Sequence, residues 1–142
     1  MKYYAVIDTN VLVSAMLRWN SVPGSVTEET LTGRIIPLLN DEIIAEYREV
    51  LSRPKFRFPV DAVGVVINEL IKRGIFLNGE TVDEIIPDPK DAVFYQVVME
   101  ARETDPAYLV TGNLKHFPAK SFVVTPREML DIINSSARVL AG

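Results

Sequence analysis

The sequence predicts an α/β fold with a mostly parallel central sheet, in a single domain that spans residues 1–142. Short apolar runs rich in β-branched and aromatic residues alternate with longer segments whose apolar residues recur at helical spacing. No internal repeat, low-complexity tract or linker divides the chain. Alternation of this kind builds right-handed βαβ units, whose helices cover both faces of a parallel sheet.

The individual elements follow from this alternation and from residues that begin or end helices. Asn40 suits the N-cap of one helix, Gly74 the end of another, and Pro89 and Pro126 the first turns of two more. The predicted strands cover 3–7, 34–39, 75–78, 108–111 and 122–125. The predicted helices cover 10–19, a short stretch ending near 31, 41–52, 60–73, 88–103 and 126–133. Residues 135–142 are expected to fray.

Composition narrows the classes of function. Hydrophobic residues make up 48% and charged residues 24% of the chain, as in an ordinary globular protein. No apolar run reaches the ~20 residues needed to cross a bilayer, and Asp8 interrupts the first run before a signal-peptide core forms. The expectation is a cytoplasmic protein. The net charge of -4 argues against a generally basic nucleic-acid binder.

The scarcity of cysteine and histidine excludes several mechanisms. The chain has no cysteine, which removes disulfides and thiolate zinc sites. Its single histidine, His116, also removes a two-histidine acid–base mechanism for RNA cleavage. Any chemistry therefore depends on carboxylates, hydroxyls, amides, or lysine and arginine.

Two predicted strands end directly in polar residues. Asp8 follows the run 3–7, and Thr111-Gly112-Asn113 stands at the end of the strand predicted at 108–111. Ligands of parallel sheets bind beyond the carboxyl ends of the strands, so this rule selects both positions. The alternative for Asp8 is a helix N-cap, which Asp serves well.

Two further acids are candidates to join Asp8. Glu46 lies on the flank of the apolar stripe of its predicted helix, about 100° from the centre of that stripe. Asp91 lies about 20° from Val98 on the predicted helix face, without a basic residue at i+3 or i+4. Solvated surface is the alternative for Glu46, while Asp88 is explained as an N-cap. Carboxylates that converge beyond a sheet suit Mg²⁺ or Mn²⁺, which prefer oxygen ligands.

Taken together, these segments make the chain resemble the PIN-domain family, and more narrowly the toxins of PIN-type toxin–antitoxin pairs related to VapC. The matching pieces are VIDTNVLVSA at 6–15, DEIIAEYREVLSRPKF at 41–56, IPDPKDAVF at 86–94 and YLVTGNLKHFP at 108–118. The first and the last are the most specific. The resemblance spans most of the chain from residue 3 to about 130.

The resemblance implies a three-layer α/β/α PIN fold and a Mg²⁺- or Mn²⁺-dependent ribonuclease that prefers single-stranded RNA. It implies a homodimer in many cases, and an antitoxin protein as partner. Asp8, Glu46 and Asp91 match the catalytic, metal-holding acids. The small polar residues Thr9, Asn10, Ser14 and Thr111 match positions that orient the acids or touch the phosphate.

The chain departs from the family pattern at Asn113, where many relatives carry a fourth acid. An asparagine keeps one oxygen for a metal but lacks the negative charge, which weakens a second metal site. Lys115 and His116 follow this position directly and are candidates to guide an RNA backbone, as are the basic residues at 53, 55, 57 and 120. The alternative for each is solvated surface charge.

Two rival functions remain open. A phosphatase of the haloacid dehalogenase type also places an Asp after its first strand, but its second Asp is Asn10 here. Its later acidic pair follows the Thr or Ser strand, whereas Asp88 and Asp91 precede Thr111. The other rival is a catalytically degenerate PIN domain that binds RNA or protein, which Asn113 and the acidic net charge both fit.

Overall fold

The computed structural model describes residues 2–141, with side chains as far as residue 135. Its centre is one five-stranded sheet, in which every neighbouring pair of strands is parallel and the order is β3-β2-β1-β4-β5. The strands are β1 Tyr3–Ile7, β2 Ile35–Leu39, β3 Ile75–Phe76, β4 Tyr108–Val110 and β5 Val123–Val124. The predicted mostly parallel sheet is confirmed.

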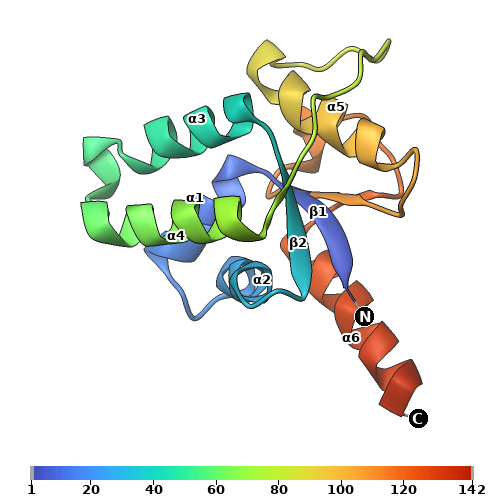
Figure 1. The fold of residues 1–142 in the computed structure, drawn as a ribbon, viewed down its shortest axis with the longest axis horizontal. Helices are drawn as coiled ribbons and strands as arrows, with labels where there is room; N and C mark the ends of the chain where they lie inside the picture. The colour runs from blue at the N-terminus through green and yellow to red at the C-terminus, as the bar shows by residue number, and fades with distance from the viewer. Residues whose placement is uncertain (1, 142) are drawn as a thin grey trace.

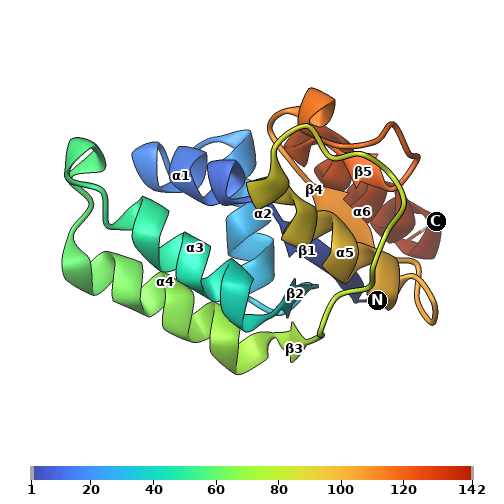
Figure 2. The same cartoon turned by 90° about the horizontal axis from the view of Figure 1, so that it is seen from above.

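Helices cover both faces of this sheet in a three-layer α/β/α arrangement, as Figures 1 and 2 show. The α-helices are α1 Thr9–Leu17, α2 Val22–Leu31, α3 Asp41–Leu51, α4 Val60–Arg73, α5 Ala92–Ala101 and α6 Pro126–Ala141. Three single 3₁₀ turns join them: η1 Pro54–Phe56, η2 Pro89–Asp91 and η3 Leu114–His116. Helix α5 packs on β1, β2 and β4, whereas α2 packs on β2 and α6. Helices α3 and α4 form an antiparallel pair that extends away from the sheet (Figure 2).

Capping residues that the sequence indicates stand at the start of two of these helical elements. The side chain of Asn40 accepts a hydrogen bond of 2.9 Å from the backbone N–H of Ile43, which confirms it as the N-cap of α3. Asp88 likewise accepts from the N–H of Lys90 at 3.0 Å, at the start of η2. The central strands β1 and β4 are apolar along their whole length because both of their faces are covered, and Ala5, Val6, Ile7, Leu109 and Val110 are almost completely buried.

Three predicted boundaries were wrong for local reasons. The helix expected at 88–103 begins instead as a 3₁₀ turn, so Asp91 lies at the junction with α5 and not on its apolar face. Helix α1 ends at Leu17 because Arg18 adopts an extended conformation. Helix α6 does not stop at Ile133 but continues to Ala141. Fraying of 135–142 stays a prediction, and Gly142 lies outside the described residues.

The strand order creates one crevice at the carboxyl edge of the sheet. From the central strand β1 the chain moves first to β2 on one side, and later returns to β4 on the other side. Such a reversal opens a binding crevice between the two neighbouring strands. Ile7 of β1 stands in register with Val110 of β4, so Asp8 and Thr111 lie side by side at its mouth. Among the described residues, no helix is long and apolar enough to span a membrane.

Candidate active site

Asp8 occupies the mouth of the crevice between β1 and β4. It immediately follows β1, its backbone N–H donates to the carbonyl of Val110 at 2.9 Å, and its side chain is only 5% exposed. The hydroxyl of Thr111 donates to Asp8 Oδ2 at 2.8 Å. Asp8 also stands at the N-cap position of α1, where the backbone N–H groups of Thr9 and Asn10 lower the pKa of its carboxylate although no side-chain capping hydrogen bond forms. The N-cap position therefore accounts for part of the environment of this carboxylate, and the bond from Thr111 for another part.

Two more contacts order the loops here, one between the ends of β1 and β4 and one within the loop after β4. Asn10 accepts a hydrogen bond from the backbone N–H of Gly112 at 3.0 Å, through its side-chain oxygen. The hydroxyl of Thr111 in turn accepts from the backbone N–H of Asn113 at 3.0 Å. A Cβ atom at residue 112 would meet the Asn10 side chain at 3.4 Å, which is an ordinary van der Waals contact. These contacts fix the two loops that carry the candidate residues.

Helix α3 brings Glu46 to the same crevice. The hydroxyl of Thr9 donates a short hydrogen bond to Glu46 Oε2. One residue further along, the buried hydroxyl of Tyr47 donates to the carbonyl of Ile7 at 2.5 Å. Tyr47 therefore anchors α3 against the last residue of β1, and Glu46 is held next to Asp8 as a consequence. Glu46 is half-buried, so it is not a fully solvated surface glutamate.

Asp91 reaches the crevice from the start of α5. Its side chain is 15% exposed, and its Oδ2 lies 3.6 Å from Nδ1 of His116. On the other side of the imidazole ring, Nε2 lies 2.9 Å from the amide nitrogen of Asn113. An amide nitrogen only donates, so the ring accepts at Nε2 and carries its proton on Nδ1, toward Asp91. The side-chain oxygen of Asn113 accepts from the N–H of Lys115 and caps η3.

The three acids affect one another electrostatically. Burial raises the pKa of Asp8, and the charge of Glu46 raises it further against the lowering effect of the Thr111 hydrogen bond. Burial also raises the pKa of Glu46, while the Thr9 hydrogen bond lowers it and the charge of Asp91 raises it. Burial together with the charge of Asp8 raises the pKa of Asp91 to about 6, although His116 partly opposes this. Negative charge is therefore concentrated at this site.

The acids do not form a ready-made metal cage in this conformation. Within the part of the chain that the structure describes, no three acidic or histidine side chains are arranged to hold one ion. Each acid instead has its own partner: Thr111 for Asp8, Thr9 for Glu46, and His116 for Asp91. The side chains of Ser14 and Lys115 are exposed, Ser14 at the solvent face of α1 and Lys115 in η3.

Comparison with known protein families decides the identity of this fold. The family model described as PIN domain matches residues 4–115, which include every candidate acid and the loops around them. The chain belongs to the PIN-domain family. Strand β5 and helix α6 follow the matched region. PIN domains are generally nucleases, so the family indicates a nuclease that binds nucleic acid.

Individual relatives add little about function. Over 116 residues, this PIN domain is 24% identical to the uncharacterized protein MJ1680 of Methanocaldococcus jannaschii; the alignment covers 80% of this chain and 72% of that protein. No solved structure matches the chain. The narrower resemblance to toxins stays a prediction.

One residue that positions the site was overlooked by sequence reasoning. In the sequence Tyr47 is one of the apolar residues of its helix and nothing marks it as part of the site, yet its hydroxyl connects α3 to the end of β1. Because a buried tyrosine hydroxyl needs a hydrogen-bond partner, its place beside Glu46 was the available signal. The partner itself, a backbone carbonyl far away in the sequence, carries no signal in the residue types.

Proposed function

We propose that this PIN domain is a metal-dependent endoribonuclease that hydrolyses phosphodiester bonds in single-stranded RNA. The observation that carries the proposal is the buried Asp8 carboxylate at the β1/β4 crevice, with Glu46 and Asp91 within its electrostatic reach. Three neighbouring carboxylates whose pKa values are raised disfavour one another unless a cation joins them. This is an arrangement suited to chemistry and costly for a purely structural role.

The donor set fits a hard divalent ion. Asp8, Glu46 and Asp91 offer only oxygen ligands, the class that Mg²⁺ and Mn²⁺ prefer, and Asn113 offers a carbonyl oxygen nearby. Such an ion supplies positive charge that stabilises the negative charge developing on a phosphodiester during hydrolysis. Thr9 and Thr111 hold two of the acids by their hydroxyls, so they act as positioning residues.

The remaining groups of the site suit proton transfer and substrate contact. With a pKa of about 6 and an imidazole beside it, Asp91 exchanges protons near neutral pH, which suits a group that accepts a proton from water. The exposed Lys115 in η3 provides positive charge for an RNA phosphate, and His116 beside it is a further candidate contact to the substrate. Asn10 bonds the loop after β4 and Ser14 lies on the exposed face of the same helix α1, and we propose both as further contacts to the RNA.

The narrower biological assignment rests on sequence resemblance. We propose that the protein is a cytoplasmic toxin of a toxin–antitoxin pair, acting as a homodimer whose activity an antitoxin protein restrains. The support is the four motifs shared with that group, at 6–15, 41–56, 86–94 and 108–118. Co-purification with the product of an adjacent reading frame, together with relief of growth arrest, tests this assignment.

The activity itself is tested with a fluorophore-labelled single-stranded RNA and protein first stripped of metal with EDTA. We expect cleavage when Mg²⁺ or Mn²⁺ is added, weaker cleavage of duplex RNA and of DNA of the same sequence, and loss of cleavage in Asp8→Asn. The matched control is Asp61→Asn, which changes an exposed acid on α4. It should cleave as the unchanged protein does.

Two results would contradict the proposal. Equal cleavage by Asp8→Asn and the unchanged protein would trace the activity to a contaminating nuclease. RNA binding without cleavage under any metal condition would instead support the degenerate PIN domain that recognises RNA. Isothermal titration with Mn²⁺ separates this second case further, because a degenerate site without metal affinity would give no heat.

A further inference from the structure

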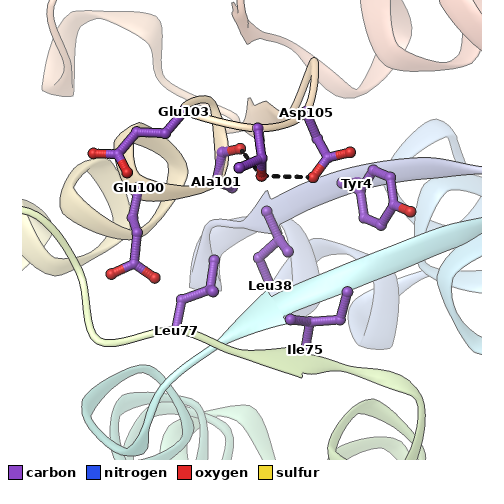
Figure 3. Close-up of a pocket in the computed structure, with 9 residues that line it drawn as sticks. Tyr4, Leu38, Ile75, Leu77, Glu100, Ala101, Glu103 and Asp105 are labelled. Carbon is purple, nitrogen blue, oxygen red and sulfur yellow. Dashed lines mark hydrogen bonds between the residues drawn. The ribbon is translucent and has the colours of Figure 1, made fainter.

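A hollow of about 440 Å³ lies on the α5 side of the sheet, toward the β3 edge (Figure 3). Its floor is formed by apolar side chains of three strands and of the residue after β3: Tyr4, Leu38, Ile75 and Leu77. Acidic side chains from the end of α5 and the following turn form its rim: Glu100, Glu103 and Asp105. None of these residues belongs to the candidate active site.

The hollow exists because the crossover after β3 leaves part of the sheet uncovered. Helix α5, which completes this crossover, packs on β1, β2 and β4. The segment 77–88, which leads to it, contains no helix. Ile75 and Phe76 of β3 therefore remain 41% and 48% exposed. Parallel strands are normally buried on both faces, so this apolar corner lacks the cover that the rest of the sheet has.

Within the described residues, the acidic side chains at the rim form no ion pair with a basic side chain. None of the ion pairs found there includes Glu100, Glu103 or Asp105. The nearest basic residue in the sequence, Arg102, instead donates to the carbonyl of Ala107 at 2.6 Å and lies 4.2 Å from the ring centre of Phe122. The rim also acts on its neighbour Glu80, whose pKa is raised chiefly by Glu103.

These features distinguish between possible occupants. In a two-fold dimer through this face, the same patch of both copies would meet, which would bring two acidic rims together. A partner with positive charge avoids this repulsion, and Lys and Arg have aliphatic stems that also suit an apolar floor. A hollow of this volume lies in the range of small binding pockets and admits one or two side chains.

We propose that this hollow is a docking site for a segment of a partner protein in which apolar side chains are flanked by lysine or arginine. The apolar residue fills the space above Leu38, Ile75 and Leu77, and the flanking cations pair with Glu103 and Asp105. Docking here does not depend on the proposed nuclease function, because the hollow and the acids share no residue.

The test uses a fluorescein-labelled synthetic peptide that alternates leucine with lysine and arginine, and measures fluorescence polarisation with the whole chain. One comparison peptide carries glutamate in place of each basic residue, and another carries serine in place of each leucine. The variants are Glu103→Lys and Ile75→Ser. Their matched controls are Glu28→Lys, an exposed acid on α2, and Ile85→Ser, an isoleucine that is 90% exposed outside the hollow.

We expect binding of the basic leucine peptide only. Glu103→Lys should weaken it up to about fivefold, since a surface ion pair contributes up to ~1 kcal/mol. Ile75→Ser should also weaken it, because this substitution removes part of the apolar floor. Neither control should change it, and amide shifts in nuclear magnetic resonance should cluster around the hollow. Equal binding by all variants, or binding of the acidic peptide, would overturn the proposal. Concentration-dependent dimerisation abolished by Ile75→Ser would also overturn it, in favour of a second copy. RNA cleavage should be unchanged in both hollow variants.

Discussion

At the scale of single residues, the site is a set of carboxylates held in place by hydroxyl groups. Asp8 and Glu46 each accept a hydrogen bond from a threonine, and these threonines come from different parts of the chain. Hydroxyl donors stabilise the charged form of an acid without neutralising it, so the acids stay available to bind a cation. This explains why the site concentrates charge and yet remains part of a folded domain.

The Thr111 hydroxyl should therefore matter to activity more than to folding. Thr111→Val preserves the shape of the side chain but removes its hydrogen bond to Asp8 and the one it accepts from the N–H of Asn113. The loss of a partner that holds a metal-binding acid costs about 10- to 100-fold in metal affinity or activity. Metal-dependent cleavage rates and Mn²⁺ titration measure the effect. The matched control is Thr30→Val, which removes a buried hydroxyl that bonds only within α2. A similar loss in this control would show that the effect is one of stability.

Asp91 should make the metal-free protein less stable as pH rises. Its pKa is about 6 in the folded protein against an ordinary 3.8, so between these values the folded state binds more protons than the unfolded state. Stability from this group is thus present at low pH and is lost as pH rises toward 6. Asp91→Asn removes that loss, because its side chain does not ionise.

Thermal unfolding in EDTA measures this effect. The melting temperature of Asp91→Asn should equal that of the unchanged protein near pH 4, and exceed it by a few degrees at pH 7. Asp83→Asn, at an exposed loop position, should show no such divergence. A difference between Asp91→Asn and the unchanged protein that stays constant from pH 4 to pH 7 would show that Asp91 does not cause it.

At the scale of elements, the site depends on how helices are attached to the ends of strands. Tyr47 fixes α3 to the last residue of β1, and α1 begins one residue after Asp8. The turn between α1 and α2 is equally constrained. A Cβ atom at Gly24 would lie 1.8 Å from the carbonyl oxygen of Trp19, so only glycine fits there.

Two glycines in helices should consequently respond in opposite ways to alanine. Gly24→Ala should destabilise the protein by about 1–3 kcal/mol, since its methyl group collides with backbone that must move. Gly64→Ala in α4 should stabilise it by roughly 0.5–1 kcal/mol, since a Cβ there meets nothing within 4 Å and alanine favours helix. Urea denaturation measures both free energies. A stable Gly24→Ala variant would show that the turn adapts easily.

Elements were predictable where one physical signal decided them. Strand β1 follows from an uninterrupted apolar run, α3 from its Asn40 cap and apolar stripe, and α4 from its stripe and Gly74 at its end. The start of α5 could not be predicted from the sequence, because Pro89 is compatible with both a 3₁₀ turn and an α-helix. The family motifs supplied Asp91 as a candidate despite the incorrect helix face. Its true environment beside His116 depends on contacts that only the folded chain provides.

At the scale of the whole molecule, an acidic protein is proposed to bind a polyanion. The net charge is -4, and acids are concentrated both in the site and around the hollow. The order of the strands in the sheet is also a property of the whole molecule, and the alternation of strands and helices in the sequence does not determine it. Alternating strands and helices are compatible with several orders, and the crevice arises only because β1 lies between β2 and β4.

The acidic surface predicts a shallow salt dependence of RNA binding. If about three basic groups contact phosphates, the logarithm of affinity should fall with the logarithm of salt concentration at a slope near −2, since single strands give ~−0.7 per contact. Polarisation of labelled RNA with the Asp8→Asn variant measures this without cleavage. Lys115→Ala should make the slope shallower by about one contact. A slope of −5 or steeper would show that many more than three basic groups contact the RNA phosphates.

The bond between Asp8 and Thr111 has a consequence for how the activity arises during synthesis. It joins residues 103 positions apart, so almost the whole matched domain must leave the ribosome before β4 can pair with β1. A nascent or prematurely terminated chain that lacks β4 has Asp8 but no crevice to hold it. Because the crevice needs both β1 and β4, we expect no nuclease activity until translation has passed β4.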